Sequence, residues 1–163
     1  MVIRISIIIT LLLLLPACTT TQTATSTQVT IGGELFTLEL MLDKSSRANG
    51  MMRRTDIAKN GGMLFVFPDS IRRSFWMKNC LIDLDIIFLD SRGTITTLYE
   101  MPIEAPQGEQ ESHLSYEARL SHYYSNGPSR FAIELRAGSI KRLKLRVNEQ
   151  IPLDLNELKS IAR

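Results

Sequence analysis

The chain has 163 residues, of which 44% are hydrophobic and 22% charged, and its formal net charge is +2. This length suits one domain, and the composition is that of a globular protein rather than a disordered or collagen-like one. The near-neutral balance argues against a dedicated nucleic-acid-binding protein, which usually carries a strong basic excess.

Residues 1–17 have the pattern of a signal peptide. Arg4 supplies a positive charge, and residues 5–15 form an apolar run. The run is shorter than the roughly 20 apolar residues of a spanning helix and matches the core of a signal peptide. It ends in the letters LPAC at positions 15–18, which resemble the lipobox of bacterial lipoproteins. This resemblance implies cleavage before Cys18 and its acylation with palmitate or similar chains; the alternative is an ordinary secretory signal with an incidental cysteine.

A lipidated Cys18 would begin the mature protein, and the Thr-rich, uncharged residues up to 28 would form a tether between the membrane and the domain. Thr19 is not the aspartate that resembles an inner-membrane retention signal. The sequence therefore predicts an extracytoplasmic, lipid-anchored protein, on the outer membrane and facing the periplasm where the cell has one. With Cys18 acylated, Cys80 has no disulfide partner and is expected to be a buried, inert thiol.

Residues 29–163 are expected to form a single, mainly β domain. Alternating apolar residues predict a hairpin over 29–42 that turns at Gly32-Gly33, and Asp43 precedes a short helical stretch that ends at Asn49-Gly50. Further strands are expected at 63–67, where Pro68 stops the strand, and at 71–77, 81–89 and 94–101.

The second half of the domain is less regular. Residues 102–129 are expected to form a long loop with a short helix around 116–120. Expected after it are a strand at 131–135, a short helix from Ser139, closing strands over 143–153 and a helical tail at 156–163. This pattern predicts a compact antiparallel sandwich or barrel with one or two short helices.

Three motifs occur in order in this domain: GMMR at 50–53, GGMLFVF at 61–67, and FWMKN at 75–79 leading into LDIIF at 84–88. Together they resemble the family catalogued as domain of unknown function 192, whose pattern is GLM-R, GMLF-F, WMKNT and LDIIF. Cys80 stands where the family usually has threonine. The resemblance implies a small, mainly β fold in proteins that are often exported, and it implies no established reaction.

The FWMKN motif is the best candidate for a ligand-binding rim. Aromatic faces such as that of Trp76 stack on sugars, and Lys78 and Asn79 supply directed hydrogen-bond donors. With Arg53 of the first motif, these residues predict a non-enzymatic binding or accessory domain for an envelope glycan, lipid or protein. The alternative is a core tryptophan followed by an ordinary turn.

A catalytic function also stays open. Asp83 and Asp85 lie two residues apart in a predicted strand and share a face, so with Lys78 they could serve a hydrolase or lyase acting on an envelope polymer. The simpler explanation is that these carboxylates cap turns or pair with nearby cations. No GxSxG, HExxH, P-loop or GxGxxG pattern occurs, and no cofactor is expected.

The methionines allow a third function. Met51, Met63 and Met77 could bind Cu(I), because soft thioethers select this ion. Methionine is also a common filler of hydrophobic cores, and several phenylalanines lie nearby in the sequence. Packing in the core is the simpler interpretation of these three residues.

Overall fold

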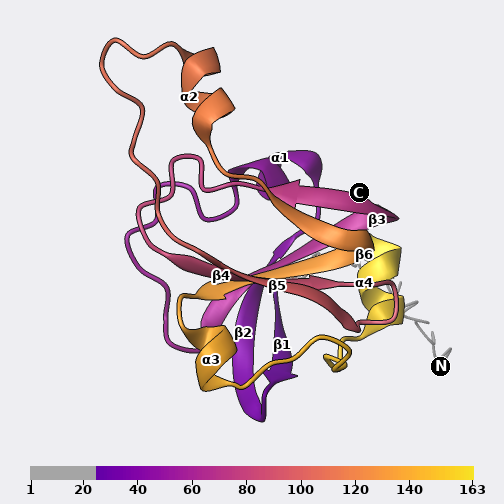
Figure 1. Ribbon diagram of the computed structural model, residues 1–163. Helices are drawn as coiled ribbons and strands as arrows, with labels where there is room; N and C mark the ends of the chain where they lie inside the picture. Colours follow the sequence, from indigo (N-terminus) through magenta and orange to yellow (C-terminus); the bar gives the residue numbers. More distant parts are fainter. Residues whose placement is uncertain (1–24) are drawn as a thin grey trace, which may run out of the picture.

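The computed structural model describes residues 25–163, so the predicted signal peptide and Cys18 lie outside the described residues. The domain is mainly β, as predicted, and it contains one six-stranded sheet with four short helices around it (Figure 1). The strands are β1 (Ser26–Ile31), β2 (Glu34–Met41), β3 (Gly61–Phe75), β4 (Leu84–Leu89), β5 (Ile95–Met101) and β6 (Tyr123–Arg136). The helices are α1 (Lys44–Asn49), α2 (His113–Arg119), α3 (Ser139–Arg142) and α4 (Leu155–Ile161).

The strand order is β1-β2-β3-β6-β4-β5, and the sheet is not closed into a barrel within the part of the chain described. All neighbouring strands are antiparallel except β2 and β3, which are parallel. The expectation of an antiparallel sheet is corrected at this pair. The reason is the connection between β2 and β3 through α1. This connection brings the chain back to the end of the sheet where β2 begins, so that β3 can run in the same direction as β2.

The start of the domain follows the sequence prediction closely. β1 and β2 form the expected hairpin, and Gly32 and Gly33 adopt the left-handed backbone of its turn, with φ of 56° and 81°. Asp43 caps α1, where its carboxylate accepts hydrogen bonds from the backbone N–H groups of Ser45 and Ser46. The helix ends before Gly50, as predicted.

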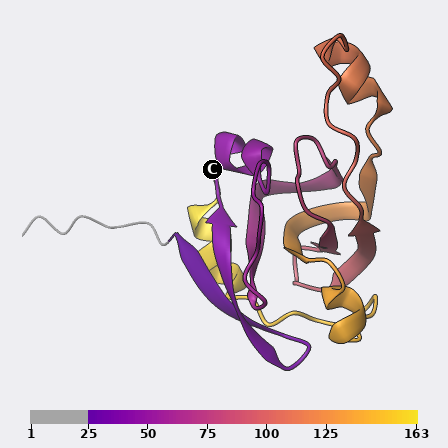
Figure 2. The same cartoon turned by 90° about the vertical axis from the view of Figure 1, so that its left-hand side faces the viewer.

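β3 is a single 15-residue strand, although the sequence predicts two strands separated by Pro68. The register against β6 shifts between Val66 and Ile71, around this proline. Proline cannot donate to the hydrogen-bond ladder, and a bulge accommodates it without ending the strand. Figure 2 shows that β6 curves strongly as it passes through the molecule.

The middle of the sheet is buried on both faces. Alternate residues of β3, β4 and β6 point into two separate hydrophobic cores. The first core takes Leu64, Val66, Ile87, Leu89, Phe131, Ile133 and Leu135 from these strands, and it also contains side chains of β1, β2 and α4. The second core takes Met63, Phe65, Leu84, Ile86, Phe88 and Ala132, together with Met51, Met77 and Met101. This double burial is why these segments have nearly continuous hydrophobic sequences.

The expected closing strands over residues 143–153 are absent from the described structure. This segment forms turns with one isolated bridge between Thr94 and Gln150. Lys144 and Asn148 have positive φ angles of 55° and 74°, which interrupt an extended backbone. Leu143, Leu145 and Ile151 enter the first core from an irregular backbone, whereas Val147 is exposed.

The remaining helices lie close to their predicted positions. α2 forms within the expected long loop and stands away from the sheet at the top of Figure 1. α4 forms the predicted helical tail, with Asp154 as its cap. No helix among residues 25–163 has the length and apolar character needed to cross a membrane.

A substitution at Gly62 tests how closely β3 packs against β6. A Cβ at this position would lie 2.5 Å from the backbone oxygen of Glu134 and 2.7 Å from the Leu135 side chain. Gly62→Ala is therefore expected to lower the free energy of unfolding by about 1–3 kcal/mol, measured by urea denaturation. Gly108→Ala is the matched control, because its Cβ would meet the nearest atom at 3.6 Å. Equal losses in both variants would contradict this prediction.

Candidate functional site

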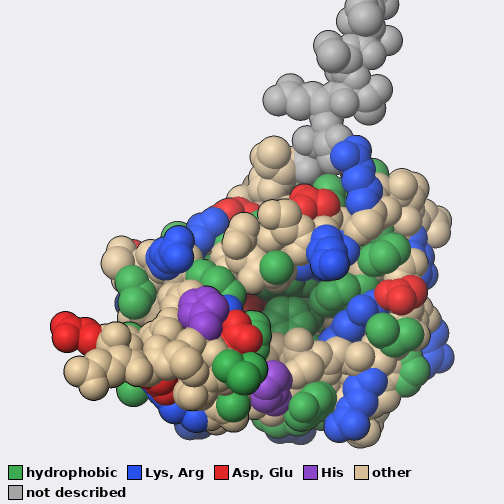
Figure 3. Space-filling view, turned by 90° about the horizontal axis from the view of Figure 1, so that it is seen from above, with side chains coloured by type: hydrophobic (Ala, Val, Ile, Leu, Met, Phe, Trp, Pro, Cys, Tyr) green, Lys and Arg blue, Asp and Glu red, His purple; other side chains and the backbone are tan. Residues whose placement is uncertain are grey.

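A cavity of about 290 Å³ lies between α1 and the start of the β3–β4 connection. The face of the molecule seen from above in Figure 3 is hollowed, and hydrophobic side chains line the hollow. The cavity is lined by Arg47, Ala48, Asn49, Gly50, Met51, Met52, Phe65, Phe67, Ser74, Phe75, Trp76, Lys78, Cys80 and Glu134. All three sequence motifs that precede β4 therefore contribute to it.

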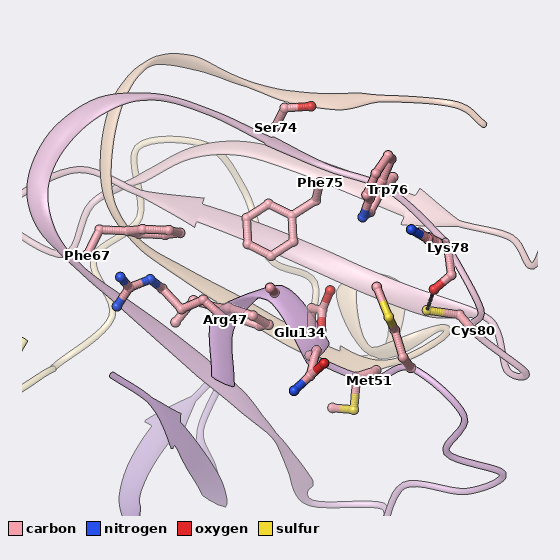
Figure 4. Close-up of a pocket in the computed structure, with 14 residues that line it drawn as sticks. Arg47, Met51, Phe67, Ser74, Phe75, Trp76, Lys78, Cys80 and Glu134 are labelled. Atoms are coloured by element: carbon pink, nitrogen blue, oxygen red, sulfur yellow. Dashed lines mark hydrogen bonds between the residues drawn. The ribbon is translucent and has the colours of Figure 1, made fainter. Parts of the chain in front are cut away.

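Glu134 lies at the inner end of this cavity, in the middle of the sheet. On β6 it alternates with residues of the first core and so faces the same side as Ala132 of the second core. Its neighbours across the ladder are Met63 on β3 and Ile86 on β4. The residue is 4% exposed, and its Oε2 atom has no hydrogen-bond partner among the described residues. Figure 4 shows the carboxyl group pointing into the cavity.

Gly50 leaves the space into which this carboxyl group points. It ends α1 with a φ of 44°, which favours glycine. A Cβ at this position would lie 3.3 Å from the Phe65 ring and 3.6 Å from Glu134 Oε2. A side chain here would narrow the cavity beside the acid.

The apolar surroundings change the ionisation of two cavity groups. Burial raises the pKa of the Glu134 carboxyl from 4.5 to about 8, so the acid is largely protonated at neutral pH. Burial, with a smaller effect of Glu134, raises the pKa of the Cys80 thiol to about 12. The thiol is therefore protonated, and it donates a weak hydrogen bond to the Lys78 carbonyl oxygen at 3.7 Å.

Three phenylalanines form an aromatic wall. The ring of Phe75 meets those of Phe65 and Phe67 edge to face, with centroids 4.9 Å and 6.4 Å apart. Arg47 lies over Phe67, with its guanidinium carbon 5.3 Å from the ring centroid. Its guanidinium donates hydrogen bonds to the carbonyl oxygens of Val66 at 3.0 Å and Arg163 at 2.8 Å.

The opposite rim is formed by Trp76 and Lys78. The Lys78 ammonium lies 5.2 Å from the Trp76 ring centroid and forms an ion pair with Glu117 of α2. The neighbouring Tyr116 is buried, and its hydroxyl oxygen accepts a hydrogen bond from the Asn79 backbone N–H at 3.0 Å. The protruding α2 thus holds the rim from outside.

The comparisons agree with this fold and these motifs. The family model of domain of unknown function 192 (DUF192), described as an uncharacterized ACR, matches residues 27–153. The chain belongs to the DUF192 family. None of the curated proteins matches this DUF192 member at a significant level.

Two solved structures resemble this DUF192 protein. One, described as "a putative transcription regulator" from Sinorhizobium meliloti 1021, is 28% identical, covers 80% of this chain and 96% of its own, and gives a TM-score of 0.62. The other, a protein of unknown function from Novosphingobium aromaticivorans DSM 12444, is 22% identical, covers 78% of this chain and 84% of its own, and gives a TM-score of 0.61. The second likeness shows the fold alone.

The structure separates the four predicted ligand-binding residues into two pairs. Trp76 and Lys78 line the cavity, whereas Arg53 and Asn79 form the turns behind it and do not line it. The Arg53 backbone N–H donates to the Asn79 carbonyl oxygen at 2.8 Å, and both residues have positive φ, 61° and 55°. The first and third DUF192 motifs are thus joined by a backbone hydrogen bond.

The predicted carboxylate pair is placed away from Lys78. Asp83 accepts a hydrogen bond from the Ile103 backbone N–H at 2.7 Å, and it lines a different surface depression. Asp85 is buried and accepts from the Ile140 backbone N–H at 2.7 Å, at the start of α3. Burial raises the pKa of Asp85, and the backbone N–H groups of Ile140, Gly138 and Ser139 oppose the shift. The two aspartates and Lys78 therefore do not share a cavity.

The three predicted copper ligands all belong to the second core. Met51, Met63 and Met77 are each at most 2% exposed, and they pack with Phe65 and Ile86. Met51 also lines the cavity. Within residues 25–163, no three His, Cys, Asp or Glu side chains gather as a possible metal site. Copper binding by the methionines stays an untested prediction.

Sequence reasoning missed Glu134, the most unusual group of the site. The signal was present, because Glu134 is the one charged residue in the apolar run Phe131–Leu135. A charge in a strand buried on both faces is rare unless it is paired or functional. The sequence identifies Gly50 only as the end of a helix, since its proximity to Glu134 depends on tertiary packing.

Glu134 gives the protein a specific pH dependence of stability. The folded protein keeps this proton up to about pH 8, whereas an unfolded glutamate loses it near 4.5. The contribution of protonated Glu134 to the stability of the folded protein is complete below the unfolded pKa of 4.5. It is lost as the pH rises through the folded pKa of about 8. Between about pH 5 and pH 8, this group should lower the free energy of unfolding by up to about 1.4 kcal/mol per pH unit.

Urea denaturation of the wild-type protein and of Glu134→Gln across this range measures the effect, because the variant lacks the titrating group. Glu134→Gln should lose most of the pH dependence of the free energy of unfolding, whereas Glu157→Gln, at an exposed position of α4, should keep it. Parallel curves for wild type and Glu134→Gln would contradict the burial effect.

Proposed function

We propose that this protein is a lipid-anchored cell-envelope protein whose domain binds one chemical group of an envelope glycan, lipid or protein without catalysing a reaction. The observation that carries the proposal is the cavity with Glu134 at its inner end. Its Oε2 atom is buried and has no partner among residues 25–163, although buried polar atoms are normally hydrogen-bonded. A ligand that enters the cavity would supply this missing partner.

The shape and lining of the cavity support a binding role. Its volume of about 290 Å³ is at the lower end of the range for small-molecule sites, so it suits a single group better than a polymer chain. Most of the wall is apolar, and its polar side chains are those of Arg47, Asn49, Ser74, Lys78 and Glu134. A mainly apolar wall with a small number of placed polar groups is the usual arrangement of a selective binding site.

The ionisation of Cys80 favours binding over covalent catalysis. A nucleophilic cysteine reacts as its thiolate, and its pKa is normally lowered by nearby positive charges. In this cavity the pKa of Cys80 is raised to about 12 instead. The pKa of Glu134 is about 8, so this carboxyl group can either donate or accept a hydrogen bond near neutral pH. We assign it to ligand recognition because its Oε2 atom has no partner among residues 25–163.

The amino-terminal sequence supports the location at the envelope. The apolar run, the LPAC sequence and the Thr-rich stretch after Cys18 together fit an acylated, tethered domain. With Thr19 after the cysteine, we favour the outer membrane facing the periplasm. This position would expose the cavity to envelope components.

The anchor is tested with the full-length precursor expressed in a bacterium that processes lipoproteins. The wild-type protein should incorporate labelled palmitate and fractionate with membranes, and Cys18→Ser should lose both properties because it lacks the acylated thiol. Cys80→Ser is the matched control and should keep them. Equal labelling of wild type and Cys18→Ser would contradict lipid anchoring at this residue.

The cavity is tested with a variant that fills it. Ala48 is an exposed residue of α1 that lines the cavity, so Ala48→Phe should obstruct the entrance at little cost to folding. Ala118→Phe, at an exposed position of α2 outside the lining, is the matched control. Trp76 is the only tryptophan in the chain, and its fluorescence reports on the rim.

A collection of envelope sugars, lipid headgroups and short peptides is titrated against wild type and both variants. We expect at least one to change the Trp76 fluorescence saturably in wild type and in Ala118→Phe, with the affinity reduced about tenfold or more in Ala48→Phe. If every ligand that binds wild type binds Ala48→Phe equally well, the cavity is not the binding site.

A further inference from the structure

We infer that the group received by this cavity is a primary or secondary ammonium carried on an apolar body, with Glu134 as its hydrogen-bonding and charge partner. This inference rests on the proposed binding function and specifies the chemistry of the ligand. It is carried by the geometry around Glu134, by the contacts that already occupy the nearby cations and by the aromatic walls.

Glu134 lacks a partner for one of its oxygens. The carboxyl group points into the cavity (Figure 4), and its Oε2 atom is buried and has no hydrogen-bond partner among the described residues. Gly50 carries no side chain beside that atom, whereas a Cβ at this position would contact it at 3.6 Å and lie 3.3 Å from the Phe65 ring. A ligand group with an N–H donor that enters the cavity would meet this carboxyl group. An ionised carboxylate offers only acceptors, so a charged N–H donor forms the stronger bond with it.

The cations at the entrance are already engaged by other groups. Lys78 forms an ion pair with Glu117 and lies near the Trp76 ring. Arg47 donates hydrogen bonds to carbonyl oxygens on the other side of the cavity. Neither cation has a hydrogen bond or ion pair with Glu134 among the contacts of the described residues.

The other groups that face Glu134 are uncharged. From the β3–β4 connection, Cys80 is a protonated thiol. From the paired strands β3 and β4, the neighbours are Met63 and Ile86. From the end of α1, Gly50 contributes only backbone. The charge that would pair with Glu134 is therefore one that the ligand brings.

The cavity walls suit an organic cation. The negative faces of aromatic rings attract such cations, and Phe65, Phe75 and Trp76 all line this cavity. A hard metal ion such as Mg²⁺ or Ca²⁺ fits poorly, because hard cations need several oxygen ligands and Glu134 is the only carboxylate in the lining. The apolar wall favours an ammonium whose remaining atoms are themselves apolar.

Binding of an ammonium changes the protonation of Glu134. Free protein holds a proton on Glu134 below about pH 8, and a bound ammonium stabilises the ionised carboxylate. Binding of the cation therefore releases this proton to solvent. The affinity should rise about tenfold per pH unit below the pKa of Glu134 and level off above it. A neutral ligand that accepts a hydrogen bond from the protonated acid would show the opposite trend.

The experiment uses 2-phenylethylamine as the probe and isothermal titration calorimetry as the measurement. 2-Phenylethanol is the neutral comparison, and a trimethylammonium analogue keeps the charge without an N–H donor. We expect the amine to bind wild type about tenfold or more tightly than either comparison compound at about pH 8. Glu134→Gln should remove this preference, and exposed Glu157→Gln should retain it.

A pH series on the wild-type protein keeps the inference testable if Glu134→Gln folds poorly. The affinity for the amine should rise by about tenfold between pH 6 and pH 7. Two buffers with different ionisation enthalpies should report the release of a proton in the same range.

Three results would overturn the inference. They are equal affinity for the amine and the alcohol, an affinity for the amine that falls as the pH rises, and no saturable binding of the amine. So would equal binding of the trimethylammonium analogue, since it cannot donate to Oε2. These results are distinguishable from failure of the proposed function. A ligand of other chemistry that Ala48→Phe blocks would preserve the binding function while excluding an ammonium as its ligand group.

Discussion

The structure depends on one constraint, which is that the central strands of the sheet are buried on both faces. β3, β4 and β6 supply alternate side chains to two cores, so their paired central positions face a hydrophobic environment on either side. A charged residue on such a strand is largely removed from water, because apolar side chains surround it on both faces of the sheet. Glu134 occupies this position, and its raised pKa and its unpaired oxygen both follow from it. The same sheet that stabilises the fold thus creates the polar centre of the cavity.

The DUF192 motifs build the space around that centre. The GMMR turn ends α1 with a glycine, which leaves room beside the acid, and it is joined to the FWMKN turn by the bond between Arg53 and Asn79. The FWMKN turn places Trp76 at the entrance, and α2 supports it through Tyr116. The motifs are therefore partly structural and partly exposed to the cavity. This division explains how one short motif can contain both a cavity residue and a turn residue.

Much of the candidate site follows from the sequence, but its chemistry does not. Trp76 and Lys78 are predicted as ligand-binding residues because of their types and their place after a strand, and the structure places both in the cavity lining. Asp83 and Asp85 are predicted as catalytic candidates because residues two apart in a strand share a face of the sheet. In the structure, each carboxylate accepts a hydrogen bond from a backbone N–H group. Glu134 is marked in the sequence only as one charge in an apolar run, which does not show what surrounds it. Its importance comes from neighbours that are far away in the chain.

The sequence by itself determined the mainly β character, the first hairpin, the cap of α1 and the membership of a family defined by three motifs. These features depend on local periodicity and on residues close together in the chain. Only the tertiary structure decided that β2 pairs with β3 in parallel, that residues 143–153 enter the core without forming strands, and that Gly50 and Glu134 meet. Strand order and cavity geometry depend on contacts between distant segments, which are fixed by how two cores pack on one sheet rather than by the pattern within any segment.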